Sequence, residues 1–144
     1  GVQAEGARAM VDAFKSGKDL IPTETNTIAD SIAVGTPRNW RRAIQQIKES
    51  HGEMIAVSDE EILEAMRVTA RLGGVFGEPA GIAGIAGLKL AVEKQIITSN
   101  ESALVIVTGN GLKDIHSAKQ AAGEALDVEP NISAMEKCFA KLKS

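Results

Sequence analysis

ALVIVTGNGLKD, residues 103–114, is the clearest indication of fold class in this 144-residue sequence. Its first five residues are apolar and mostly β-branched, without the polar alternation of a strand that is open to water on one face. Such a run is typical of a parallel strand that helices cover on both faces. We therefore predict a buried central strand over residues 103–107, with Thr108 at its carboxyl end.

The residues that follow this strand form a candidate binding loop. Ligands of open parallel sheets bind beyond the carboxyl ends of the strands, which is where the Thr108 hydroxyl is expected. Gly109 and Gly111 would let the backbone approach a ligand closely. Three other interpretations stay open: a plain strand-to-helix turn, a phosphate cradle of backbone N–H groups and an Asn-Gly hairpin turn. The hairpin is the least favoured, because residues 113–117 do not resume a strand.

Three motifs carry a family resemblance. They are TIADSIAVG at residues 27–35, EPAG at residues 78–81 and TGNGLKD at residues 108–114. In this order they resemble the threonine synthases, pyridoxal-phosphate enzymes with the tryptophan-synthase-β-like fold (fold type II). The first two motifs are shared with related dehydratases, whereas the GLKD ending points more narrowly to threonine synthases. The resemblance runs from Gly1 to about Glu136.

This resemblance implies a fold and a site. Strands alternating with helices already predict a three-layer α/β/α domain with a mainly parallel sheet, and the family has this architecture. By resemblance, Thr108 would face the pyridine nitrogen of pyridoxal phosphate, with Gly109 and Asn110 beside it. Glu78 would lie near the cofactor end of the sheet, and Ala29 against one face of the ring. A buried connection of small residues is the alternative for the Ala29 segment.

Two parts that the family carries are missing from these residues: the Schiff-base lysine in its usual context and the glycine-rich phosphate loop. We therefore expect residues 1–144 to be the C-terminal portion of the large cofactor-binding domain of a longer enzyme, with no catalytic residue of their own and no activity alone. By resemblance, the parent converts O-phospho-L-homoserine and water to L-threonine and phosphate. A threonine or serine dehydratase and a free-standing, non-catalytic α/β binding module remain alternatives.

The rest of the chain predicts the following elements. Strands are expected at residues 1–4, 53–57 and, at an edge, 127–129. A helix with Ala7, Met10, Val11 and Phe14 inward should stop at Gly17, and Thr36-Pro37 should open the next. Ser58 and Glu61 form a predicted capping box, as do Ser133 and Glu136, whose helix would turn Met135, Phe139 and Leu142 inward. A further helix is predicted over residues 118–126. Gly81, Gly84 and Gly87 indicate a helix in close contact with its neighbours.

Composition excludes several partners. The 16 basic and 19 acidic residues are interspersed and give a net charge of −3, which does not favour nucleic acid or anionic membranes. Aromatic residues make up only 3% of the chain, too few for base stacking. We expect no metal site and no membrane span. Cys138 is the single cysteine and allows no internal disulfide, so we expect a cytoplasmic protein. We also expect a homo-oligomer that works on a small-molecule substrate together with the missing N-terminal portion.

Overall fold

The computed structural model describes residues 1–123 and 125–142, with Leu142 described by its backbone alone. The predicted inward position of the Leu142 side chain therefore lies outside the described part. In chain order the elements are β1 (Val2–Ala4), η1 (Glu5–Ala7), α1 (Ala9–Ser16), η2 (Asp30–Ile32), α2 (Trp40–Glu49), β2 (Ile55–Val57), α3 (Asp59–Gly73), α4 (Pro79–Glu93), η3 (Gly111–Lys113), α5 (Ile115–Ala122) and α6 (Ile132–Leu142), where η marks a 3₁₀ helix.

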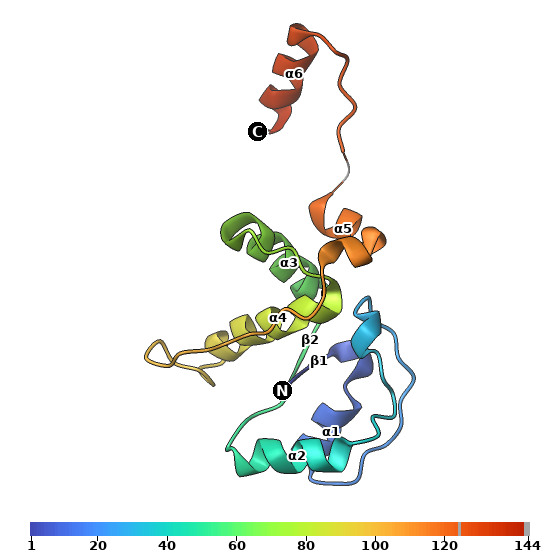
Figure 1. Ribbon diagram of the computed structural model, residues 1–144, viewed down its shortest axis with the longest axis vertical. Helices are drawn as coiled ribbons and strands as arrows, with labels where there is room; N and C mark the ends of the chain where they lie inside the picture. The colour runs from blue at the N-terminus through green and yellow to red at the C-terminus, as the bar shows by residue number, and fades with distance from the viewer. Residues whose placement is uncertain (124, 143–144) are drawn as a thin grey trace.

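A short parallel sheet lies between two helical layers (Figure 1). Strand β1 pairs with β2, and Ala4 stands opposite Val57. These two side chains are fully buried in a core shared with α3 and α4, whereas Ala56 points to the other face and packs against the core of α1 and α2. The second core contains Val11, Ala13, Ile44 and Met54. The described sheet has two strands, with α/β/α layering around them as predicted.

Local sequence signals explain where several elements begin and end. The predicted capping box of α3 is confirmed: the Glu61 amide donates to the Ser58 hydroxyl at 3.2 Å, and the Ser58 amide donates to the Glu61 carboxylate at 2.7 Å. Gly17 ends α1 with a left-handed φ of 68°, as predicted, and Gly74 ends α3 with a φ of 65°. Only glycine adopts this conformation at little cost.

Helix α4 lies unusually close to its neighbours along one face. A Cβ on Gly87 would stand 2.3 Å from Val2 of β1, and a Cβ on Gly84 would stand 3.0 Å from Val105. A Cβ on Gly81 would stand 2.9 Å from the backbone nitrogen of Gly109. The spacing of the three glycines thus has the predicted cause: it lets the helix backbone lie directly on the chain segments beside it.

The prediction of a buried central strand over residues 103–107 is wrong for the chain as described. The segment is extended and runs along α4 (Figure 1), but it is in no ladder, and no backbone hydrogen bond joins it to β1 within the described residues. Val105 faces Gly84 of α4 and Val107 packs against the core beside Gly77, whereas Leu104 is 85% and Ile106 is 72% exposed. A strand needs a partner for its amides and a cover for each face, and here only one face is covered.

Other differences concern helix starts. Helix α2 begins at Trp40 and not at Thr36-Pro37, because residues 35–39 form bends and a turn. Helix α5 covers residues 115–122 and not 118–126. The start of α6 is capped by Asn131, whose side-chain oxygen accepts from the Ala134 amide at 2.9 Å, so the Ser133 box is wrong.

The last part of the described chain lacks the predicted packing. Residues 127–129 form no strand, and helix α6 stands away from the other helices (Figure 1). Met135 is half exposed and Phe139 more than half, so neither points into a core. Across the described residues, no helix is both long and apolar enough to cross a membrane.

Candidate functional site

The site is built where the start of α4 meets the loop at residues 108–111. The Glu78 amide donates to the Gly109 carbonyl at 3.0 Å, and the Gly111 amide donates to the Phe76 carbonyl at 2.9 Å. Between them, Gly77 and Asn110 form an isolated antiparallel bridge. These contacts fix the loop against residues 76–78, and they bring Glu78 beside the two residues after Thr108.

Gly109 leaves room for the Glu78 side chain at this contact. A Cβ added at Gly109 would lie 2.1 Å from Oε1 of Glu78, so the carboxylate packs directly on the loop backbone. The Glu78 side chain is only 6% exposed. A buried carboxylate is costly unless it is paired, and this one has a cation beside it.

Lys113 supplies that cation. Its ammonium lies 3.0 Å from Oε2 of Glu78 and donates to Oε1 at 3.3 Å. The same nitrogen donates to the Ser31 hydroxyl at 3.0 Å, and Ser31 in turn donates to Oδ1 of Asp30 at 3.1 Å. Three segments far apart in the sequence therefore meet at one ammonium group: η2, the start of α4 and η3.

Thr108 follows the extended segment directly, although this segment is not the predicted central strand, and it is exposed. Its backbone nitrogen is among the atoms that a Cβ on Gly81 would crowd, at 3.3 Å. Within the described residues its hydroxyl has no hydrogen bond. The hydroxyl can donate or accept without carrying a charge, and it is open to a ligand.

Ala29 is placed differently from the other predicted site residues. It is 0% exposed and belongs to the core that α3 and α4 share. Asp59 holds the segment before it, accepting from the Thr27 hydroxyl at 2.5 Å and from the Ile28 amide at 3.1 Å. Within residues 27–35, Asp30, Ser31 and Val34 are exposed, and Asp30 and Ser31 directly follow Ala29 and are polar. The geometry therefore favours these two over Ala29 as the residues that a ligand would meet.

The side chains of Asn110 and Asp114 cap the two helical segments that follow Thr108. The Asn110 side chain caps η3 by accepting from the Leu112 amide at 2.9 Å. The Asp114 carboxylate caps α5 by accepting from the Ser117 amide at 3.0 Å. Two hydrogen bonds from Ser117 lower the pKa of Asp114. The bond from its hydroxyl has the larger effect, and the bond from its amide has the smaller. Both caps fix the path of the chain after Thr108.

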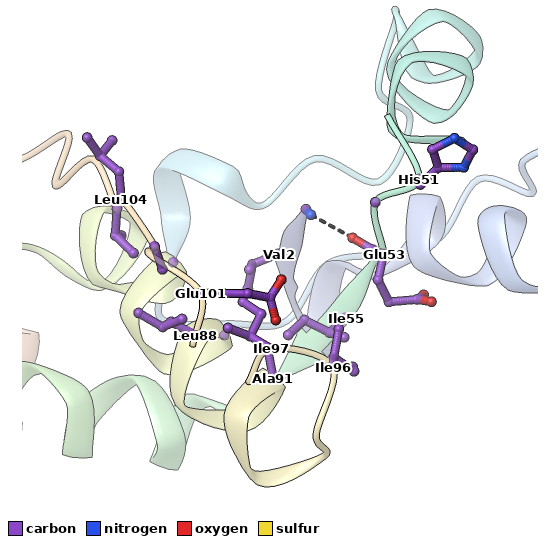
Figure 2. Close-up of a pocket in the computed structure, with 16 residues that line it drawn as sticks. Val2, His51, Glu53, Ile55, Leu88, Ala91, Ile96, Ile97, Glu101 and Leu104 are labelled. Carbon is purple, nitrogen blue, oxygen red and sulfur yellow. Dashed lines mark hydrogen bonds between the residues drawn. The ribbon is translucent and has the colours of Figure 1, made fainter. Parts of the chain in front are cut away.

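A hollow of about 430 Å³ lies at the other end of the extended segment (Figure 2). Its lining comes from the start of β1 and β2, from the second half of α4 and from residues 103–105. Val2 and Ile55 face Leu88 and Ala91 across it, and the Gly1 amine donates to the Glu53 carbonyl at its rim at 2.7 Å. The hollow thus separates β1 from the segment that the sequence predicts to be a strand.

Helices packed on a parallel sheet, with a polar loop beyond an extended apolar segment, are features of open α/β domains, whose ligands bind beyond the carboxyl ends of the strands. Residues 1–109 match the family model described as pyridoxal-phosphate dependent enzyme, and the chain belongs to this family. Within it, the chain is 42% identical to the threonine synthase of Methanocaldococcus jannaschii over 144 residues, or 99% of the chain. The match covers 36% of that relative, so the chain spans about a third of its length.

Solved structures show the same fold. The processed form of threonine deaminase isoform 2 from Solanum lycopersicum superposes with a TM-score of 0.67 at 25% identity, over 85% of this chain and 34% of that one. Threonine synthase from Escherichia coli superposes with a TM-score of 0.65 at 19% identity, over 98% of this chain and 37% of that one. The chain therefore has the fold of type II pyridoxal-phosphate enzymes, as the motifs predicted.

The residues present fit one end of this cofactor. Thr108 offers an uncharged, exposed hydroxyl, which suits a pyridine nitrogen, and the loop after it lies against Glu78 without any side chain from Gly109 between them. The cofactor's phosphate would need a cradle of backbone N–H groups, and we assign none among the described residues. The predicted cofactor contacts of Thr108, Gly109, Asn110, Glu78 and Ala29 stay predictions.

Sequence reasoning missed two residues of this arrangement, Lys113 and Ser31. Both lie inside motifs that carried the family resemblance, GLKD and IADS. A lysine after a glycine loop and a serine after an aspartate are common on protein surfaces, so neither stands out without the fold. Their meeting at Glu78 depends on how the chain folds between them.

Proposed function

We propose that this chain is the C-terminal portion of a threonine synthase, which converts O-phospho-L-homoserine and water to L-threonine and phosphate. The observation that carries the proposal is the 42% identity to a curated threonine synthase over 99% of the chain. The chain's place in the pyridoxal-phosphate family supports the same reaction class.

The chain's own residues would supply one side of the cofactor site. The Thr108 hydroxyl would hydrogen-bond the pyridine nitrogen, and the loop at residues 108–110 would support that end of the ring. When bound, the cofactor supplies an electron sink for the substrate's reacting carbons. A neutral hydroxyl leaves the pyridine nitrogen less protonated than a carboxylate would, which limits the sink and favours elimination and replacement over transamination. The nearby Glu78 carboxylate is paired with Lys113 and therefore would not pair with the pyridine nitrogen.

Two observations support a longer parent protein. The curated relative is covered over only 36% of its length. In addition, the extended segment at residues 103–107 leaves Leu104 and Ile106 exposed, and a hollow separates it from β1. We propose that the remaining part of the enzyme supplies strands and a covering layer there, together with the Schiff-base lysine and the phosphate loop. The chain alone is then expected to be inactive.

The proposal also covers the substrate, the compartment and the assembly of the intact enzyme. The substrate is a small molecule, and the enzyme is proposed to be a cytoplasmic homo-oligomer, with the exposed apolar side chains of the described residues as candidate contact surfaces. A single cysteine, Cys138, fits a reducing compartment.

A dehydratase of the same fold is the second candidate, because a threonine deaminase superposes with a TM-score of 0.67. Product analysis of the intact protein with added pyridoxal phosphate distinguishes a threonine synthase from a dehydratase. Threonine synthase releases equal amounts of threonine and phosphate from O-phospho-L-homoserine. A dehydratase releases ammonia and a 2-oxo acid from threonine. Ammonia from threonine without phosphate release from the first substrate would reject the proposal, and absence of both activities would favour a non-catalytic module.

A further inference from the structure

We propose that Lys113 is a positioning residue of the cofactor site, acting through Glu78 and Ser31. By bridging these two side chains it sets the separation between η2 and the loop at residues 108–110, the two walls between which the cofactor ring would lie. The inference rests on the proposed function and deepens it, because it assigns a role in cofactor binding to a residue outside the predicted set.

The first support is the convergence of contacts on the Lys113 ammonium. An ammonium group has three donors, and here it meets both oxygens of Glu78, at 3.0 and 3.3 Å, and the Ser31 hydroxyl, at 3.0 Å. One wall carries Ser31 and the other is packed on Glu78. Among the described residues, the Lys113 ammonium is the polar link between the Ser31 side chain and Glu78, in addition to the apolar packing of η2 on the core that α4 shares.

The second support is the state of the Glu78 carboxylate. Its side chain is 6% exposed and makes no capping hydrogen bond at the start of α4, although Glu78 is the N-cap residue. Lys113 is its cationic partner among the described residues. Because a buried carboxylate without a partner is strongly disfavoured, loss of Lys113 would force Glu78 to turn toward water. That movement would withdraw the side chain on which Gly109 rests.

The third support is the position of Lys113 in the chain. It ends η3, whose first residue, Gly111, is fixed by its hydrogen bond to Phe76. Its side chain is 61% exposed, so a substitution there leaves no cavity in the core. An effect of Lys113 substitution on the site would therefore come from its polar contacts and not from lost packing.

The test uses the intact protein with Lys113→Met, Lys113→Arg, Ser31→Ala and, as matched control, Lys119→Met. Lys119 is an exposed lysine on α5, so its substitution removes the same charge nearby. The measurements are the dissociation constant of pyridoxal phosphate, visible circular dichroism of the bound cofactor, and hydrogen exchange of a peptide covering residues 28–35.

We expect Lys113→Met to weaken cofactor binding roughly tenfold, as the loss of charged hydrogen bonds predicts. It should also change the circular dichroism and speed exchange at residues 28–35. Lys113→Arg should restore most of the affinity, and Lys119→Met should match the wild type. Ser31→Ala should add nothing to Lys113→Met in the double variant, because both remove the same link.

Unchanged cofactor affinity and circular dichroism in Lys113→Met, with normal binding by the wild type, would overturn this inference and leave the proposed function standing. So would additive effects of Ser31→Ala and Lys113→Met, or failure of Lys113→Arg to restore affinity. If the wild type binds no pyridoxal phosphate, the proposed function fails as well. Should Lys113→Met not fold, the arginine and alanine variants still decide between these outcomes.

Discussion

Gly81→Ala should destabilise the protein although alanine favours helices. Gly81 lies in the first turns of α4, where alanine would gain up to about 1 kcal/mol over glycine from helix propensity alone. Its Cβ, however, would stand 2.9 Å from the backbone nitrogen of Gly109, 3.1 Å from the Gly109 oxygen and 3.3 Å from the Thr108 nitrogen. These are backbone atoms, which cannot rotate away. Either α4 or the loop must move.

The expected size of the effect follows from two opposing contributions. Adding a methyl group to a tightly packed contact costs about 1–3 kcal/mol. Moving the loop also strains the hydrogen bond from the Glu78 amide to the Gly109 carbonyl, 3.0 Å long, whose full loss would cost about 1 kcal/mol. Against the gain in helix propensity, the net loss of unfolding free energy should be about 1–2 kcal/mol. Cofactor affinity should fall too, because Thr108 moves with the loop.

The assay is urea unfolding of the intact protein, with Gly73→Ala as control. Gly73 is the last residue of α3, and a Cβ there meets nothing within 4 Å. This variant should be as stable as the wild type or slightly more stable. If Gly81→Ala were as stable as Gly73→Ala and bound cofactor normally, α4 would not lie on the loop as closely as described.

Three further outcomes are expected. Thr108→Val in the intact protein should fold normally but lose roughly 1–3 kcal/mol of cofactor binding and transition-state stabilisation; unchanged affinity and turnover would reject its role. The hydrogen bonds from Ser117 lower the pKa of Asp114 below 3.8, so this carboxylate stabilises the fold above that pH and loses its contribution as the pH falls further. Unfolding free energies of the wild type and Asp114→Ala should therefore differ more at pH 7 than at pH 3, and an equal difference would contradict this. The chain alone should sediment as dimers or larger species at micromolar concentration, because Leu104, Ile106 and Phe139 are exposed; a clean monomer would count against it.

Signals that act within one turn of the chain were predictable from sequence. The Ser58 and Glu61 capping box satisfies backbone donors three residues apart, and the glycine at position 17 ends its helix by its own conformation. Neither depends on distant residues. The glycines of α4 were predictable as a sign of close contact, although the sequence did not say which segments lie against them.

Features that depend on distant partners were not predictable in the same way. Residues 103–107 have the composition of a buried strand, but a strand exists only with a hydrogen-bonded neighbour, and none is present among the described residues. The link of Lys113 to Glu78 and Ser31 joins residues 35 and 82 positions apart in the chain. No local pattern encodes such a meeting. Ala29 likewise has a small side chain that suits either a ligand or a core, and the structure places it in the core.

The claim that the loop at residues 108–110 forms the pyridine end of a cofactor site is tested most directly by a structure of the intact protein with bound pyridoxal phosphate. We predict that the Thr108 hydroxyl lies within hydrogen-bonding distance of the pyridine nitrogen, with the Glu78 carboxylate still paired to Lys113. A different residue facing that nitrogen, or a cofactor bound away from this loop, would contradict the account.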